Sequence, residues 1–193
     1  MKRDLRRTTP LTSSFLSCEK DTETILRKLF IENKPYSDEL KRLLVINTKD
    51  CLDNPNNPVY VEKLEAMTLA KLKEEGYIKI VPKINRIEHE ELKSYLIISF
   101  DNFSPTLNPE FRDCMVIIDI ICPLDYWDLG NYRLRPLKIA GYIDGILNNC
   151  KLSGIGTFNF MGCNELMLEE DFSGYTLIYQ ATHGSDDKIE GEE

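Results

Sequence analysis

The spacing of apolar residues changes from a helical to a strand pattern at Gly76, and this change limits the folds that the chain can adopt. Upstream, residues 59–75 carry apolar side chains three or four positions apart, which is the spacing of one helix face. Downstream, residues 77–81 alternate between apolar and polar positions, as a half-buried strand does. Helices followed by strands, with one further helix and more strands later, predict an α+β fold with a mostly antiparallel sheet.

The same two spacings of apolar residues, helical and alternating, predict the remaining elements. They are helices at residues 21–34, from 37 onward and at 59–75, strands at 77–81, 94–100 and 113–122, a helix at 132–147, and strands at 157–161, 164–169 and 175–183. Residues 102–111, which contain two prolines, are expected to form a loop, and Gly162 is expected to mark a β-bulge. The expected architecture is thus a sheet with N-terminal helices and one later helix packed on it.

Two features of these elements predict how they pack. Residues 113–122 are apolar on both faces apart from Asp119, which predicts a central strand that is covered on both sides. In the helix that follows, Leu137 belongs to the expected buried stripe. Gly141 and Gly145 lower the helix propensity of the same segment, so we expect them to allow close approach to the sheet or to another helix.

Composition and charge indicate one globular domain and exclude several classes of protein. The 193 residues are 42% hydrophobic and 29% charged, which is ordinary for a globular domain. The formal net charge of -8 argues against free nucleic acid as the main partner, because phosphate binding needs a basic surface. The apolar runs are far shorter than the ~20 residues of a membrane span, and no apolar region of a secretory signal is present. We therefore expect a protein that is made and folded in a cytoplasm.

The two ends of the chain carry opposite charge. Residues 1–9 sum to +3 and residues 185–193 sum to -4, which predicts polar ends that extend from an acidic body. The chain is therefore divided into an extended N-terminal arm at 1–19, a single domain at 20–184 and an acidic C-terminal tail at 185–193. The ends either fray in solvent or become ordered against a neighbouring subunit, and the sequence leaves both possibilities open.

The sequence contains no recognisable catalytic or cofactor-binding motif. It has no G-x-S-x-G, Walker A, G-x-G-x-x-G or C-x-x-C pattern, and His89 does not have the H-E-x-x-H spacing of a zinc site. The six cysteines are expected to be small buried side chains, with Cys114 and Cys122 on the same face of one strand. We therefore predict that the protein is not an enzyme and needs no metal or cofactor.

Acidic side chains leave one enzymatic alternative open. Asp101, Asp119 and Glu91 are a candidate set for a metal-dependent nuclease, since such enzymes need several carboxylates that converge on one ion. Asp119, inside an apolar strand, should be paired with a basic side chain or lie at an interface. Its candidate partners are Arg133, Arg135 and Lys138.

Residues 124–135 are the strongest candidate for an interface. Tyr, Trp and Arg dominate interface energetics because they bury a large area while their polar tips are satisfied, and this segment holds the only Trp of the chain. The predicted interface residues are Tyr126, Trp127, Tyr132, Arg133 and Arg135, together with Arg3, Arg6 and Arg7 of the basic arm. In the alternative, the aromatic side chains of this loop fold back on the protein's own core.

The second half of the chain resembles a known family. Residues 116–120 (VIIDI) lead through the Trp-bearing loop to the helix sequence LRPLKIAGYIDGIL, and a glycine-bearing turn and two final strands follow. This pattern resembles the tail-terminator and head–tail joining proteins of tailed bacteriophages, and the likeness covers residues 77–183. The connector rings of crAss-like gut phages are of this general kind. The long N-terminal region with its basic arm departs from the family pattern and leaves open whether the ring ends a long tail or connects a short one.

The resemblance implies a small α+β subunit of a six- or twelve-fold ring between the portal or capsid and the tail, without enzymatic activity. Its partners would be further copies of itself and the neighbouring connector, portal and tail proteins, and its location would be the virion at the head–tail junction. DNA would pass through the lumen without specific binding, because an acidic wall repels the phosphate backbone. A nuclease and a cytoplasmic adaptor protein stay open as alternatives.

Overall fold

Strand β3 (Phe111–Pro123) lies at the centre of a five-stranded sheet whose order is β1-β2-β3-β7-β6. The computed structural model describes residues 10–80, 92–107, 111–153, 155–168 and 171–184. Neighbouring strands of this sheet are antiparallel, except that the short β1 is parallel to β2. The predicted α+β class, with a mostly antiparallel sheet and N-terminal helices, is confirmed.

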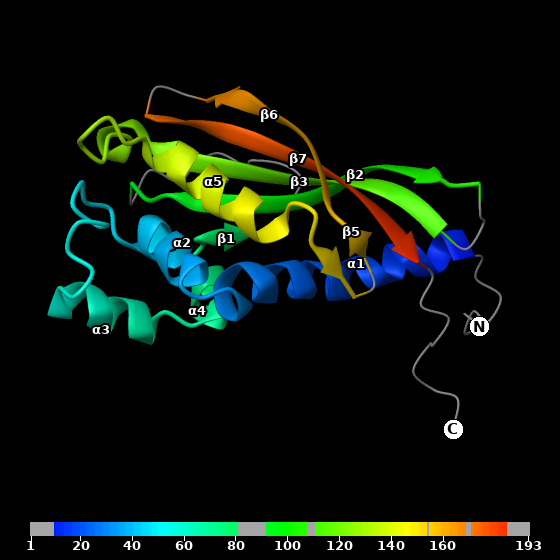
Figure 1. Cartoon of the computed structure of the whole chain (residues 1–193), viewed down its shortest axis with the longest axis horizontal. Helices are drawn as coiled ribbons and strands as arrows, with labels where there is room; N and C mark the ends of the chain where they lie inside the picture. Colours follow the sequence, from blue (N-terminus) through cyan, green and yellow to red (C-terminus); the bar gives the residue numbers. More distant parts are fainter. Residues whose placement is uncertain (1–9, 81–91, 108–110, 154, 169–170, 185–193) are drawn as a thin grey trace.

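The helices come before the sheet in the chain, except for α5, which is inserted between strands (Figure 1). The elements before the sheet are α1 (Pro10–Arg27), the π-helical turn η2 (Lys28–Glu32), α2 (Tyr36–Val45), α3 (Pro58–Ala66) and α4 (Leu69–Glu74). The later elements are β1 (Ile78–Lys79), β2 (Tyr95–Pro105), β3, the 3-10 turn η3 (Leu124–Tyr126), α5 (Arg135–Leu147), β4 (Lys151–Leu152), β5 (Gly156–Thr157), β6 (Asn159–Met167) and β7 (Phe172–Gly184). No helix in these described segments is long and apolar enough to cross a membrane.

The main core lies between the sheet and the helices α1, α2 and α5. Alternate residues of β3, such as Val116, Ile118 and Ile120, are buried in one cluster with Ile25 of α1 and Ile143 of α5. In Figure 1, α5 crosses the front of the sheet, and α1 and α2 lie below it in the same helical layer. These helices contribute their apolar stripes to one face of the sheet, which positions the loop before α5 at the end of the molecule.

β3 is central, as predicted, but the prediction that it is covered on both faces is wrong for much of its length. Met115, Ile117 and Asp119 point away from the helical layer and are only half-buried. A smaller cluster of buried residues covers one end of this second face; it contains Tyr95, Ile97, Ile121 and Phe172. The apolar composition of β3 therefore reflects one helix-covered face and one face that is partly open, which we call the open face.

Several predicted boundaries are wrong. Residues 10–19, expected to be an extended arm, form the first turns of α1, and Pro10 stands at the first position, where proline is tolerated. The predicted helix at 59–75 is divided at Met67, and the Thr68 side chain accepts a hydrogen bond from the Lys71 N–H at the start of α4. The predicted loop at 102–111 is replaced over most of its described length by the ends of β2 and β3.

Three local features of the sheet and its connections lie at glycines. The register of β6 against β7 shifts between Phe160 and Gly162, which confirms the predicted bulge. Gly76 has a φ of +75° after α4, a conformation that glycine adopts without steric cost. At Gly174, a Cβ atom would collide with the backbone carbonyl of Ile120, so the close approach of β7 to β3 requires glycine at this position.

Candidate functional site

The loop that carries the predicted interface residues connects β3 to α5 and is held by local backbone pairing. Asp128 and Leu134 form an isolated β-bridge, and the Leu129 N–H donates to the Arg133 carbonyl at 2.9 Å. Asn131 and Tyr132 both adopt positive φ angles, 52° and 60°. A positive φ is unfavourable for an aromatic residue, so the pairing on both sides holds Tyr132 in a strained conformation.

Arg135 was predicted at an interface, and the structure shows that this prediction is wrong. Its side chain is 0% exposed and donates to four backbone carbonyls within the chain. The acceptors, with the donor–acceptor distances, are Tyr126 at 2.7 Å, Leu43 at 2.6 Å, Ile46 at 3.0 Å and Thr48 at 2.6 Å. Leu43 lies in the last turn of α2, whose carbonyls lack partners within the helix, so the guanidinium caps that helix end. Arg135 therefore joins α2 and the following segment to the loop and cannot face a partner.

Tyr126 and Trp127 lie on the side of the loop that faces the protein. Trp127 is half-buried, packs against the main core, and its ring centroid lies 6.3 Å from that of Tyr175. Tyr126 is also half-buried, and its carbonyl is one of the acceptors of Arg135. The alternative in which the aromatic side chains fold back on the core therefore describes Trp127.

Tyr132 and Arg133 lie on the outer side of the same loop. The Tyr132 side chain is fully exposed. Arg133 forms an ion pair with Asp53, with both N–O distances at 2.8 Å, and donates to the Leu129 carbonyl at 3.1 Å. The hydrogen bond from Arg133 holds the pKa of the Asp53 carboxyl below its usual value. Of the loop residues predicted at an interface, Tyr132 and Arg133 are the pair that the structure brings together at the surface.

These two residues form one end of a groove of about 620 Å³ along the outer face of α5, which we call the α5 groove. It is lined by Tyr36, Tyr132, Arg133, Leu134, Leu137, Lys138, Gly141, Tyr142 and Gly145. Added Cβ atoms at Gly141 and Gly145 would meet nothing within 4 Å, so the expected close packing at these glycines is absent from the described structure. Leu137, expected in the buried stripe, is 45% exposed.

Sequence reasoning did not identify Tyr36, Leu137, Lys138 and Tyr142 as groove residues. Tyr36 and Tyr142 come from α2 and α5, and their ring centroids lie 6.0 Å apart. Pro136 was a usable signal for the helix boundary, since proline is favoured in the first turn of a helix. A helix that begins at Arg135 has its buried stripe centred on Ile139 and Ile143, which places Leu137 about 200° around the axis from Ile139.

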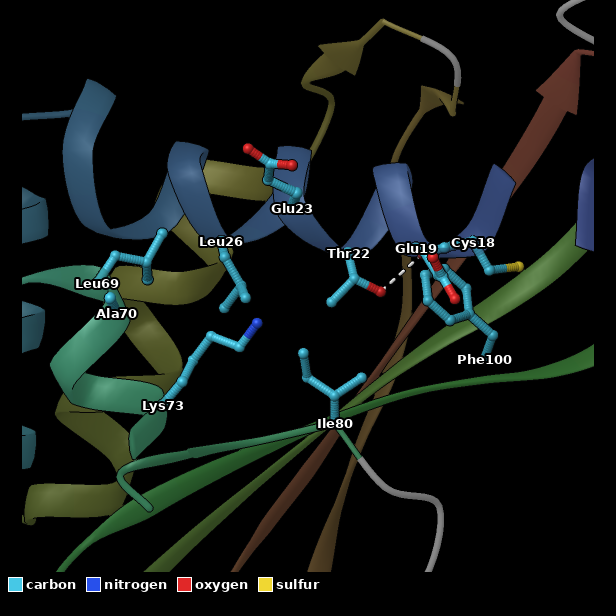
Figure 2. A pocket seen from close by; sticks show the side chains of 10 residues that line it. All are labelled: Cys18, Glu19, Thr22, Glu23, Leu26, Leu69, Ala70, Lys73, Ile80 and Phe100. Atoms are coloured by element: carbon cyan, nitrogen blue, oxygen red, sulfur yellow. Dashed lines mark hydrogen bonds between the residues drawn. The ribbon is translucent and has the colours of Figure 1, made fainter. Parts of the chain in front are cut away.

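A second groove of about 610 Å³ lies between α1, α4 and the strands (Figure 2). Its lining residues are Cys18, Glu19, Thr22, Glu23, Leu26, Leu69, Ala70, Lys73, Ile80 and Phe100. Figure 2 shows Thr22 and Leu26 pointing down from α1, the Lys73 side chain reaching in from α4, and Ile80 lying opposite. The Thr22 hydroxyl donates to the Cys18 carbonyl at 2.8 Å, and burial raises the pKa of the Cys18 thiol to about 11. This thiol is therefore a poor nucleophile near neutral pH, and the groove is mainly apolar.

The acidic residues of the nuclease alternative do not converge in the described structure. Asp101 and Asp119 lie on the open face, but Asp101 is opposite Met115, four residues along β3 from Asp119. Four residues of a strand span about 13 Å. Within the described residues, no group of three or more His, Cys, Asp or Glu side chains is arranged to hold a metal ion.

Asp119 has a different partner from those predicted. The Thr176 hydroxyl of the neighbouring strand β7 donates to its carboxylate at 2.6 Å. Arg135 and Lys138 belong to α5, on the other face of the sheet, so the prediction of a basic partner is wrong. Burial raises the pKa of the Asp119 carboxyl above its ordinary value, and the Thr176 bond offsets part of that effect.

The cysteines divide into buried and surface thiols. Cys114 and Cys122 are buried on the helix-covered face of β3, as predicted, and burial raises their pKa values to about 12 and about 11. Cys163, on β6, is exposed, and Cys18 and Cys150 are half-buried, so the prediction of small buried side chains is wrong for these three. The predicted residues Arg3, Arg6, Arg7, Glu91 and His89 lie outside the described residues.

Comparison with known proteins adds one family relationship. A family model described as YomW matches residues 37–181, well over half of the chain, and no curated protein matches. The matched region begins in α2 and ends in β7, so it contains α5, every lining residue of the α5 groove except Tyr36, and the sheet from β1 to most of β7. The chain therefore belongs to the YomW family, a phage-derived family, and is a phage-associated protein.

Proposed function

We propose that this protein is a virion structural protein, a subunit of a ring at the head–tail junction that either terminates a long tail or connects a short one. Membership in a phage-derived family supports a viral role. The order of β3, α5 and the β6–β7 hairpin agrees with the strand, helix and closing hairpin of the tail-terminator and head–tail joining proteins. The role needs no catalytic group, metal or cofactor, and its partners are further copies and the neighbouring portal, connector and tail proteins.

The α5 groove is the observation that carries this proposal. Tyr132 is held in a strained conformation with its ring fully in solvent, and Tyr36 and Leu137 are exposed beside it. None of these three side chains is needed to fill the core of the subunit. Large exposed apolar and aromatic side chains that gather along a groove are typical of a surface that another protein covers.

The open face of the sheet suits a channel wall. β3 places Asp113 and Asp119 on this face, and β2 adds Asp101. Neither β3 nor β7 carries a lysine or arginine on this face, and the basic side chain that β1 adds, Lys79, lies with its ammonium group 4.6 Å from the centroid of the Tyr95 ring. We assign this face to the lumen of the ring, where repulsion between its carboxylates and the phosphate backbone lets DNA pass without specific binding.

The copy number in purified virions tests the proposal. We expect the protein in virions at six or twelve copies, measured by quantitative mass spectrometry against a structural protein of known stoichiometry. Absence from virions, or a copy number that fits neither ring, would refute the proposed function.

The basic residues Arg3, Arg6 and Arg7 are proposed to contact a neighbouring subunit. Because α1 begins at Pro10, removal of residues 1–9 leaves the described helix intact. We expect this truncation to keep the melting temperature of the protein and to lower its incorporation into virions. Normal incorporation would show that the arm has no part in assembly.

A further inference from the structure

Exposed apolar side chains gather in two places on the described surface. Eleven large apolar side chains are exposed among the described residues, and six of them fall in two groups. Three line the α5 groove: Tyr36, Tyr132 and Leu137. The other three lie on β6 and are named here the β6 edge: Phe160, Met161 and Met167. One surface is concave and the other is a projecting strand.

The β6 edge has a bulge and one carboxylate, Glu165, but lacks other features that protect the end of a sheet in monomeric proteins. β6 is the last strand of the sheet, so no described strand lies along its outer side. Monomeric proteins place lysine or proline on such an edge, or keep it short, and β6 has nine residues with no lysine, arginine or proline. The bulge between Phe160 and Gly162 leaves Met161 unpaired and 54% exposed. An exposed edge strand with three large apolar side chains and no lysine or proline is able to pair with or dock on another chain.

The α5 groove and the β6 edge also carry charges of opposite sign, which attract each other. The α5 groove presents the ammonium group of Lys138, while the guanidinium of Arg133 is paired with Asp53 and the Glu39 carboxylate is hydrogen-bonded to Tyr142. β6 carries one carboxylate, that of Glu165, and no basic group. Because each chain has a net charge of -8, two copies repel each other at long range, and contact between them needs a local match of this kind.

We propose that the β6 edge of one copy docks in the α5 groove of the next copy. The inference rests on the proposed function, because a closed ring needs two different and complementary surfaces on every subunit. Met161 and Phe160 of one copy cover Leu137 and the open side of Gly141 of the other. Every subunit then has its groove filled by one neighbour and its sheet edge covered by the other neighbour.

Two substitutions test the proposal by blocking one surface each. Leu137→Glu places a charge in the α5 groove, and Met161→Glu places one on the β6 edge; both side chains are about half exposed, so the fold is expected to tolerate the change. Val59→Glu is the matched control, since Val59 lies on α3, is 68% exposed and belongs to neither surface. The full-length proteins are compared by native mass spectrometry, and thermal melts monitored by circular dichroism show that each variant is folded.

The two variants give different results alone and together. We expect the Val59→Glu protein to form the wild-type ring, and each of the other two variants alone to be monomeric. An equimolar mixture of Leu137→Glu and Met161→Glu should form a heterodimer and nothing larger, because the intact β6 edge of the first fits the intact groove of the second.

Three outcomes would overturn the docking inference: a wild-type chain that forms no ring, a ring that persists in either blocked variant, or a mixture that gives no heterodimer. If Met161→Glu abolishes assembly and Leu137→Glu does not, the result indicates instead that two β6 edges pair with each other. These results are separate from the virion copy number, so a failure of the docking inference is distinguishable from a failure of the proposed function.

A cross-link gives a second test that does not depend on weakening the assembly. Gly141→Cys has open space for its side chain, and the native Cys163 is exposed near Phe160 on the same face of β6. Under oxidising conditions we expect a ladder of disulfide-linked oligomers on a non-reducing gel, since a disulfide within one chain does not raise its mass. The Gly141→Cys/Cys163→Ser double variant should lose the ladder. A Gly141→Cys protein that gives no more cross-linking than this control would overturn the inference.

Discussion

Arg135 provides the sharpest test of how the described structure is held together. Its buried guanidinium donates to four backbone carbonyls, three of them in residues 43–48 and one in Tyr126. Arg135→Met keeps most of the aliphatic stem and removes every donor. The perturbation therefore leaves the packing nearly unchanged and leaves four acceptors without these bonds.

The magnitude follows from the number of bonds. A buried polar group that loses its partner costs about 1–3 kcal/mol, so four carbonyls at the lower end of this range cost about 4 kcal/mol. Removal of a desolvated charge returns part of this cost. We expect Arg135→Met to lower the free energy of unfolding by about 2–4 kcal/mol, a large fraction of the 5–15 kcal/mol that is typical of a folded protein. Arg135→Lys, which retains the charge and three donors, should lose less.

Urea unfolding followed by fluorescence measures this change. Trp127 is the one tryptophan of the chain and is half-buried beside the Arg135 site, so it reports on the region directly. Arg133→Met is the matched control, because Arg133 lies two residues away and its ion pair with Asp53 is on the surface. All variants are compared at one protein concentration, since self-association adds to the apparent stability. The midpoint for Arg135→Met should fall by roughly 1–3 M urea, and that for Arg133→Met should change much less.

Equal urea midpoints for the two variants would refute this reasoning. If Arg135→Met unfolds at the same urea concentration as Arg133→Met but no longer assembles, Arg135 acts at an interface, as its sequence context predicted. If both variants keep wild-type stability, the four carbonyl bonds do not contribute to the fold in the way described.

Three further predictions follow from local geometry. Gly174→Ala should lower the free energy of unfolding by at least about 2 kcal/mol, measured by thermal denaturation, because its Cβ meets a backbone carbonyl of β3, whereas Gly162→Ala has open space and should be tolerated. Tyr132→Asn should be as stable as the wild type or about 1 kcal/mol more stable, since Asn accepts a positive φ more readily, while ring formation measured by native mass spectrometry weakens. Burial raises the pKa of Asp119 above its unfolded value of about 3.9, so its contribution to stability is complete below that pH and is lost as the pH rises through the folded pKa. Asp119→Asn should therefore unfold at a higher urea concentration than the wild type at pH 7, and the two should converge below pH ~4. A difference that is equal at both pH values would contradict this explanation.

The helical and strand periods were sufficient to predict the fold class, the central position of β3 and the bulge at Gly162. They did not predict that only one face of β3 is covered over much of its length, because an apolar strand is compatible with one or two covering layers. The start of α1 was missed because residues 10–19 lack a regular apolar spacing, and the start of α5 was placed too early because the signal from Pro136 was not used.

The candidate site was predicted as a segment but not residue by residue. The acceptors at Leu43 and Ile46 lie 92 and 89 positions before Arg135, so no local pattern indicates that this arginine is buried. Arginine is among the residues least often fully buried, which favours the wrong assignment. The α5 groove likewise depends on Tyr36 from α2, whose position beside Tyr142 is a consequence of the tertiary structure.

The two arginines of the loop, predicted to act together, have different roles that depend on each other. Arg135 fixes the loop to α2 from inside, and the outer part of the same loop holds Tyr132 at a positive φ. A surface that is rigid before contact loses less conformational entropy when a partner binds. Arg133, paired with Asp53 at the surface, restrains the same segment on its outer side. In the proposed ring, the buried arginine acts through the shape of the α5 groove, so Arg135→Lys should weaken ring formation in proportion to the order it removes from the loop, although the side chain touches no partner.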